Sequence, residues 1–183
     1  MNLNNLSEIM PPDLTAEILG LITEEKYKKN HILHKEGTTC NYIYIVKTGI
    51  ARTFYHKEEK DISVHFALEG DVTTAIDSLI SREKSRYGIE LLEDCELKVI
   101  SYRELQTLLS KYPQYEEYIR AIILHSYVQL ANRVEEFLFF NAKERYDNLI
   151  KEKPKLLQRV NLGHISSYLG ITQETLSRIR KSV

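Results

Sequence analysis

The sequence lacks long hydrophobic runs: no stretch of about eighteen consecutive apolar residues occurs, so it predicts no transmembrane helix. The amino-terminal segment Met-Asn-Leu-Asn-Asn-Leu has neither the basic stretch nor the apolar core of a secretory signal peptide. The two cysteines, Cys40 and Cys95, are far apart and form no CxxC pair, which favours a reducing compartment. We therefore expect a cytoplasmic protein that does not associate with a membrane.

Motifs of common enzyme classes are also missing. There is no Walker A loop, no GxSxG and no HExxH. His31 and His34 are spaced as a metal pair, but no third ligand follows at a recognisable spacing, and two lone histidines on a polar strand usually lie at the surface. We expect no catalytic residues, no metal and no cofactor. A cupin-like metalloenzyme remains an alternative, although His56 and His65 do not clearly supply the clustered ligands it needs.

Charge is distributed unevenly along the 183 residues, a length that suits one large or two small domains. From Lys143 to Val183 there are nine Lys or Arg against four Asp or Glu, a net charge of +5, whereas the preceding residues carry −6. A basic carboxy-terminal segment on an acidic body fits local phosphate binding. The alternative is that the charged block is only a solvated face.

The carboxy-terminal residues have the pattern of two short helices joined by a tight turn. Gly170 allows such a turn at low steric cost, and Thr172 is a good N-cap for the second helix. Apolar residues on both sides of the turn can form one small core: Ile165, Leu169, Ile171, Leu176 and Ile179. The outer face of the second helix carries residue types that bind base edges and phosphates in a major groove, namely Gln173, Glu174, Ser177, Arg178 and Lys181. An ordinary helical hairpin with a polar face would share this pattern.

The sequence of the amino-terminal half predicts one short helix over residues 12–22, followed by β structure. Between residues 26 and 101, short runs of β-forming residues are separated by turn signals. The expected strands cover residues 42–46, 50–55, 62–68, 89–92 and 97–100. Strands at this spacing predict a small antiparallel barrel or sandwich.

A long helix is expected after a short one over residues 102–109. Pro113 opens it, and it continues to about Phe140 without a breaker, a length of about 40 Å. Its apolar residues recur at nearly heptad spacing: Ile119, Ile123, Tyr127, Leu130, Val134 and Phe137. A core helix could show the same stripe, but a helix longer than a small β domain favours a parallel homodimer. With Asn141-Ala142 as the hinge, the expected divisions are residues 1–112, 113–141 and 142–183.

The last segment resembles the DNA-binding end of the Crp/Fnr family of bacterial transcription regulators. The matching residues are Ile165, Tyr168-Leu169-Gly170, Thr172, Glu174-Thr175 and Ser177-Arg178-Ile179. The resemblance implies that the second helix enters the major groove, where Glu174 and Arg178 read bases. Gln173 stands where the family often has arginine, so the preferred base at one operator position should differ. Family members often continue into a β-hairpin wing, whereas this sequence ends at Val183.

The glycines of the β segment extend the resemblance over nearly the whole chain. Gly37, Gly49 and Gly70-Asp71 match turn glycines of the cyclic-nucleotide-binding β-roll. The family's ribose-binding glycine and glutamate correspond to Thr74 and Ala75, and its base-contacting positions to Leu130 and Ala131. Arg86 is the best match to the arginine that pairs with the cyclic phosphate, and the alternative is that it pairs with Asp77 or Glu90 on the surface. The resemblance therefore implies weak or no binding of cyclic AMP, and leaves open an unidentified small-molecule effector.

These observations predict an α+β protein with an antiparallel β-roll, a long dimerisation helix and a helix-turn-helix. The expected function is a transcription regulator, not an enzyme, that binds a near-palindromic operator in double-stranded DNA as a homodimer and contacts or blocks RNA polymerase. The DNA-binding residues would be Thr172, Gln173, Glu174, Ser177, Arg178, Arg180 and Lys181. A β-roll sensing module that acts through protein partners is the alternative, and only DNA binding predicts a steep salt dependence.

Overall fold

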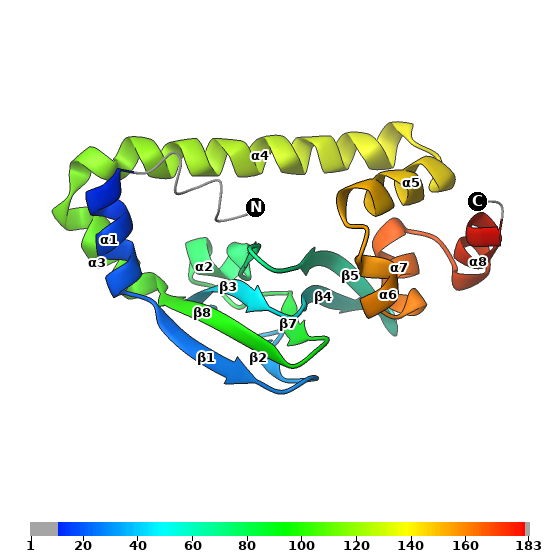
Figure 1. Ribbon diagram of the computed structural model, residues 1–183, viewed down its shortest axis with the longest axis horizontal. Helices are drawn as coiled ribbons and strands as arrows, with labels where there is room; N and C mark the ends of the chain where they lie inside the picture. The colour runs from blue at the N-terminus through cyan, green and yellow to red at the C-terminus, as the bar shows by residue number, and fades with distance from the viewer. Residues whose placement is uncertain (1–10, 182–183) are drawn as a thin grey trace.

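A computed structural model describes residues 11–181. It has a β-roll in the middle, one long helix along most of the length of the molecule, and a group of short helices at one end (Figure 1). This is the expected α+β architecture. No helix within the described range has both the length and the apolar composition needed to cross a bilayer.

The β-roll consists of two four-stranded sheets whose strand pairs are all antiparallel. The chain enters it through helix α1 (Pro12–Gly20). The first sheet has the order β1 (Thr23–Tyr27), β8 (Cys95–Ser101), β3 (Tyr42–Thr48) and β6 (Val72–Thr73). The second has the order β2 (Ile32–His34), β7 (Gly88–Leu91), β4 (Ala51–Lys57) and β5 (Lys60–Ala67). Helix α2 (Ile76–Ser81) follows β6.

The turn between β3 and β4 requires glycine. Gly49 has a φ of +99°, and a β-carbon there would lie 2.2 Å from the Cys95 sulfur atom. Both the backbone conformation and the close approach of the next sheet strand exclude a side chain. Cys95 and Cys40 are free thiols buried in the β-roll core, which Val46, Ile89 and Leu97 help to fill.

The five expected strands are present as β3, β4, β5, β7 and β8. The short elements β2, β6 and α2 were not predicted individually. Strand β1 was not among the expected strands. Its charged sequence, Thr-Glu-Glu-Lys-Tyr, has no apolar alternation. It is held instead by pairing with β8 from Thr23 opposite Val99 to Tyr27 opposite Cys95.

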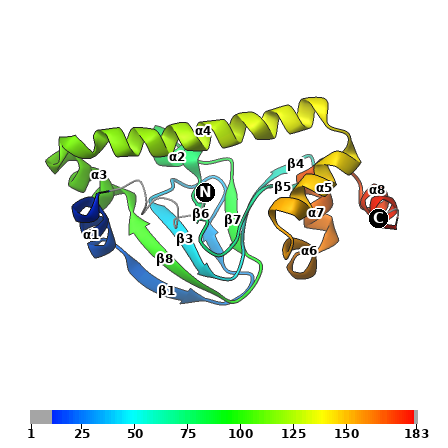
Figure 2. The same cartoon turned by 45° about the horizontal axis from the view of Figure 1, so that its top comes forward.

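The connection from the β-roll to the carboxy-terminal helices is a single long helix. Helix α3 (Tyr102–Lys111) is followed by a 3₁₀ turn, η2 (Pro113–Tyr115), and then by α4 (Glu116–Phe139). The prediction that Pro113 opens the long helix was wrong by three residues, because the proline opens the 3₁₀ turn instead. The 24 residues of α4 give a rod of about 36 Å. It lies across the β-roll on the side of α2 (Figure 1 and Figure 2).

Four helices complete the chain: α5 (Ala142–Glu152), α6 (Leu156–Arg159), α7 (Leu162–Leu169) and α8 (Gln173–Lys181). The bend between α4 and α5 is at Phe140, whose backbone is extended. Asn141 then begins α5 with a capping box, in which its side chain accepts hydrogen bonds from the N–H groups of Lys143 and Glu144.

Candidate nucleic-acid interface

Helices α7 and α8 form the helix-turn-helix that the sequence predicted. Ile165, Leu169 and Leu176 are fully buried, and Ile171 and Ile179 pack against the same cluster. Gly170 ends α7 with a φ of +67°, the left-handed conformation that allows the tight turn. The expected small core between the two helices is therefore present.

The start of α8 has the expected polar capping. The Thr172 hydroxyl accepts a hydrogen bond from the N–H of Thr175 at 3.2 Å, as an N-cap residue does. A hydrogen bond from Thr172 and the backbone N–H of Glu174 lower the pKa of the Glu174 carboxyl. Glu174 is consequently charged at neutral pH and able to accept hydrogen bonds from a donor such as cytosine N4.

The outer face of α8 is open to solvent. Thr172, which caps the helix, and the six α8 residues predicted to bind DNA are all exposed: Gln173, Glu174, Ser177, Arg178, Arg180 and Lys181. Arg178 lies along the helix, with Nη2 3.3 Å from the Thr175 hydroxyl. The side chains suited to a major groove thus gather on one accessible helix at the end of the molecule (Figure 1).

Two arginines that the sequence did not single out secure the turn. Arg133 of α4 donates from Nη2 to the Tyr168 carbonyl at 2.7 Å, and its guanidinium lies 3.9 Å from the centre of the Tyr168 ring. Arg145 of α5 donates from Nε to the Leu169 carbonyl at 3.1 Å. These bonds satisfy carbonyls at the end of α7, which have no partner within the helix.

The helix-turn-helix is docked on the β-roll. Phe66 of β5 and Ile50, which precedes β4, belong to the same buried cluster as Ile165, Leu169 and Leu176. The Phe66 ring lies 5.2 Å from the Tyr168 ring. The two parts of the chain therefore share one hydrophobic core, a feature that the local sequence pattern did not indicate.

Ion pairs surround this shared core. Arg159 of α6 binds Glu93 and Glu69, with Nη2 at 2.5 and 2.6 Å from a carboxylate oxygen of each. Lys153 donates to Asp71 at 2.9 Å and to the Phe66 carbonyl at 3.1 Å. The hydrogen bonds from Arg159 lower the pKa of Glu69 to about 2.

The carboxy-terminal excess of positive charge is therefore divided between two roles. Lys153, Arg159 and Arg145 bind groups within the protein, and Lys143 pairs with Asp147 at 2.8 Å. Exposed cations of the same segment include Lys151, Lys155, Arg178, Arg180 and Lys181. The net charge of this segment overstates what is available for phosphate contacts.

The predicted apolar seam of α4 lies at the surface. No residue of α4 is buried, and 45–67% of the surface of each of Ile123, Tyr127, Leu130, Val134 and Phe137 is exposed. Ile119 is half-buried. The Phe137 ring also lies beside Gly170, since a β-carbon placed on that glycine would be 3.1 Å from the ring. The carboxy-terminal end of the seam therefore also touches the helix-turn-helix.

The β-roll has different side chains at the positions that would hold a cyclic nucleotide. Ala75, at the position of the ribose-binding carboxylate, is fully buried. The neighbouring Thr74 hydroxyl donates to the Tyr42 carbonyl at 2.9 Å. Arg86 is exposed and lies 5.0 Å over the Tyr87 ring, and its backbone N–H donates to Asp77. These residues do not supply the paired acceptor and cation that a ribose and cyclic phosphate require.

His34 corrects the expectation that both members of the histidine pair lie at the surface. A β-bulge between Ile32 and His34 breaks the alternation of β2, so that Ile32 is exposed and His34 is buried. Its Nε2 is the only buried side-chain nitrogen or oxygen without a hydrogen bond among the residues for which such contacts are described. Within residues 11–181, no three His, Cys, Asp or Glu residues are grouped as metal ligands.

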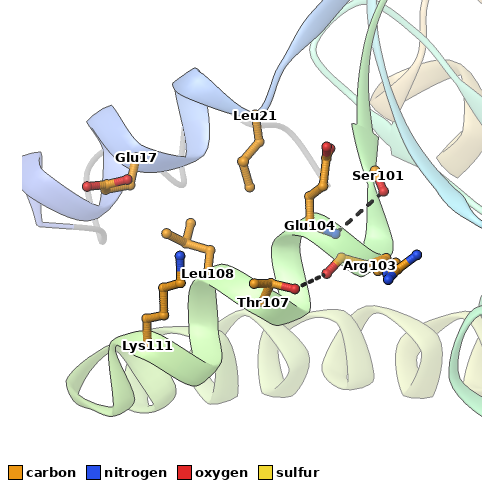
Figure 3. A pocket seen from close by; sticks show the side chains of 8 residues that line it. All are labelled: Glu17, Leu21, Ser101, Arg103, Glu104, Thr107, Leu108 and Lys111. Carbon is orange, nitrogen blue, oxygen red and sulfur yellow. Dashed lines mark hydrogen bonds between the residues drawn. The ribbon is translucent and has the colours of Figure 1, made fainter.

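A surface pocket of about 580 Å³ lies between α1 and α3, at the opposite end of the molecule from α8 (Figure 3). Charges of both signs line it, with Glu17 and Glu104 near Lys111 and Arg103. Its distance from α8 separates it from the candidate DNA interface. Its lining is completed by Leu21, Ser101, Thr107 and Leu108.

The family model described as the cyclic nucleotide-binding domain matches residues 24–112, which contain the β-roll and α3. The solved structure of FixK2 from Bradyrhizobium japonicum has the same fold, with a TM-score of 0.75 and 22% identity over 88% of this chain and 83% of that one. With 88% of the chain covered, the structural match is longer than the segment that the family model matches. The chain is thus similar in sequence and in fold to regulators of the Crp/Fnr family.

Further relatives are similar to this chain over most of its length. An anaerobic regulatory protein of Pasteurella multocida is 24% identical over 165 residues, covering 83% of this chain and 59% of that protein. A Crp/Fnr-family transcriptional regulator from Eubacterium rectale has a TM-score of 0.71 and 16% identity, covering 97% of this chain and 85% of the other. The chain spans about three fifths of the length of the first curated relatives it matches.

Proposed function

We propose that this chain is a transcription regulator of Crp/Fnr type that binds double-stranded DNA sequence-specifically, without enzymatic activity, in the cytoplasm. The observation that carries the proposal is the helix-turn-helix itself. Its core residues Ile165, Leu169 and Leu176 are buried, and the polar side chains of α8 are exposed on one accessible helix. This is the arrangement in which a recognition helix enters a major groove.

Within α8, we assign base reading to Glu174 and Arg178. Positions 174, 177, 178 and 181 share one helix face at the spacing i, i+3, i+4 and i+7. The charged Glu174 carboxylate can accept from cytosine, and the Arg178 guanidinium can donate to both acceptors of guanine. Arg180 and Lys181 lie nearer the helix end and would contact phosphates or support the helix.

The operator is proposed to be near-palindromic because the protein would bind it as a homodimer. A helix with exposed Ile123, Tyr127, Leu130 and Val134 and no buried residue is supported as a dimerisation element, since packing against a second copy would remove this apolar surface from water. A parallel pair of α4 helices gives a two-fold axis along the seam. The two copies of α8 would then face half-sites about 34 Å apart.

We propose that the bound protein regulates transcription by contacting or by blocking RNA polymerase.

The effector would not be cyclic AMP, because Ala75 offers no acceptor to ribose hydroxyls and the Arg86 guanidinium lies over the ring of its neighbour Tyr87. An unidentified small molecule remains part of the proposal as the effector.

Selection of bound fragments from a pool of random DNA tests the function directly. The expected result is enrichment of one inverted repeat whose half-sites are one helical turn apart. Recovery of unenriched sequences, together with capture of a defined protein partner by the same face of α8, would favour the sensing module that acts through proteins.

A further inference from the structure

Gly163 is the second residue of α7, and its backbone conformation does not require glycine. Its backbone is not in the left-handed region that α7 reaches at Gly170. Glycine within a helix is less favourable than alanine by about 1 kcal/mol, so the missing side chain needs another explanation. The local structure supplies one, because the space beside Gly163 is occupied.

The occupant is the carboxamide of Gln173, the first residue of α8. A β-carbon on Gly163 would lie 2.7 Å from the Gln173 Nε2 atom and 3.8 Å from its Cδ. It would also lie 3.2 Å from Oδ1 of Asn161, the N-cap residue whose side chain accepts from the N–H of His164 at 2.8 Å. The Gln173 side chain is thus folded back onto the first turn of α7, not extended from α8.

We propose that Gln173 is a positioning residue whose carboxamide packs against the start of α7, and that Gly163, by leaving room for that carboxamide, keeps it out of base reading. The inference deepens the proposed function and rests on it, because it concerns which α8 side chains reach the groove. Gln173 is largely exposed and is the first residue of α8, yet the end of its side chain lies beside Gly163 of the neighbouring helix. Base discrimination then falls to Glu174 and Arg178.

One methyl group added at position 163 should displace the Gln173 carboxamide from its position beside α7, which we call its seat. A contact of 2.7 Å is too short for a β-carbon, so the end of the flexible Gln173 side chain must move, and Oδ1 of Asn161, at 3.2 Å, must shift slightly. The substitution Gly163→Ala should therefore be tolerated by the fold, since alanine also favours the helix. The displaced carboxamide would point away from α7 into the groove. A glutamine there can make two hydrogen bonds to adenine, which predicts a new preference for adenine.

Four proteins test this: the wild type, Gly163→Ala, Gln173→Ala and the double variant, each used in the same DNA selection. We expect Gln173→Ala to keep the wild-type sequence preference and to bind every sequence slightly less tightly. Gly163→Ala should gain a preference of about tenfold for adenine at one additional position. The double variant should lose that preference, which a merely structural effect of Gly163→Ala would not do.

Loss of discrimination at one base pair in Gln173→Ala alone would overturn the inference, since it would mean that the wild-type glutamine reads a base. An unchanged selection by Gly163→Ala would also overturn it. The seat itself is measured without DNA, by a nuclear Overhauser contact between the Gln173 side-chain amide protons and the Gly163 α-protons. Absence of that contact contradicts the inference, whereas its presence in a protein that selects no DNA contradicts only the proposed function.

Discussion

Ser63 of β5 and Ser167 of α7 are joined by two hydrogen bonds although 104 positions separate them in the chain. The Ser63 N–H donates to the Ser167 hydroxyl at 3.0 Å, and that hydroxyl donates to the Ser63 hydroxyl at 3.0 Å. Ser63 Oγ in turn accepts from the buried Arg52 at 3.0 Å. Helix α7 of the helix-turn-helix is therefore connected to the interior of the β-roll by specific polar contacts as well as by apolar packing.

Phe66→Ala should destabilise both the β-roll and the carboxy-terminal helices, because Phe66 belongs to the core that they share. Phe66 is 1% exposed, and removing a buried phenylalanine ring costs about 3–5 kcal/mol of unfolding free energy. Val64→Ala on the same strand is the matched control, because Val64 is 39% exposed and should change stability by less than ~1 kcal/mol. Chemical denaturation followed by circular dichroism measures both. Hydrogen exchange that shows the carboxy-terminal helices protected as well in Phe66→Ala as in the wild type would contradict the shared core.

The contact between Glu69 and Arg159 should make stability depend on acidity. Arg159 holds the pKa of Glu69 at about 2, below its ordinary value of 4.5. The folded state therefore favours the charged carboxylate. This stabilisation is complete above pH 4.5 and is lost as the pH falls towards 2. Glu69→Gln should flatten that part of the stability profile.

Glu59→Gln is the control for the acid profile, since Glu59 is an exposed residue of the β4–β5 turn. The measurement is the midpoint of urea unfolding at a series of pH values. Equal slopes below pH 4.5 for Glu69→Gln and the wild type would show that the Arg159 contact does not stabilise the docked state.

A double substitution of Leu130 and Val134 by Asp should give monomers that lose operator binding. Two charges would then face each other across the seam, in place of two side chains that are 61% and 50% exposed in the single chain. His125→Asp together with Asn132→Asp is the matched control, because those exposed positions lie on the opposite face of α4. Sedimentation at micromolar concentration measures the oligomeric state. A wild-type monomer under those conditions would contradict dimerisation through α4.

Cyclic AMP should bind weakly or not at all, because Ala75 is buried where a ribose-binding carboxylate would be needed. Leaving hydroxyl groups of a bound ligand without acceptors costs about 1–3 kcal/mol for each group. Isothermal calorimetry measures the affinity, with a nucleotide-binding member of the family as the positive control. A dissociation constant in the low micromolar range would show that other residues replace the missing carboxylate.

Arg178→Ala should cost roughly 1–3 kcal/mol on the selected operator and relax the preference at one base pair. Lys181→Ala is the comparison: it should weaken all sequences similarly and reduce the salt slope by about one. Affinities for the operator and for single-base variants distinguish the two effects. The reverse pattern would mean that α8 lies in the groove in a different register.

The parts that sequence predicted well are those whose information is local. The apolar periodicity around Gly170, and the N-cap at Thr172, lie within one short segment, and they specify α7 and α8. The exposed stripe of α4 likewise follows from spacing along a single helix. The short strand β2 was harder to predict from the sequence, because the register shift that accompanies the burial of His34 arises in its pairing with β7.

Contacts between distant segments could not be predicted in this way. Arg159 and Glu69 are 90 positions apart, and nothing in either local sequence indicates that they meet. The same is true of Phe66, which alternates like any strand residue but completes the core of the helix-turn-helix. The seat of Gln173 on Gly163 depends on side-chain direction, which residue spacing along a helix does not determine.

The central claim is that the chain binds DNA through α8 with sequence specificity, and a salt titration of the wild type on its selected operator tests it most directly. We predict a linear fall of log affinity with log salt concentration, amounting to roughly a thousandfold between 50 and 200 mM. Specific binding should exceed binding to a scrambled duplex by at least about a thousandfold. An affinity no greater than that of an acidic control protein, with no dependence on salt or sequence, would contradict the account.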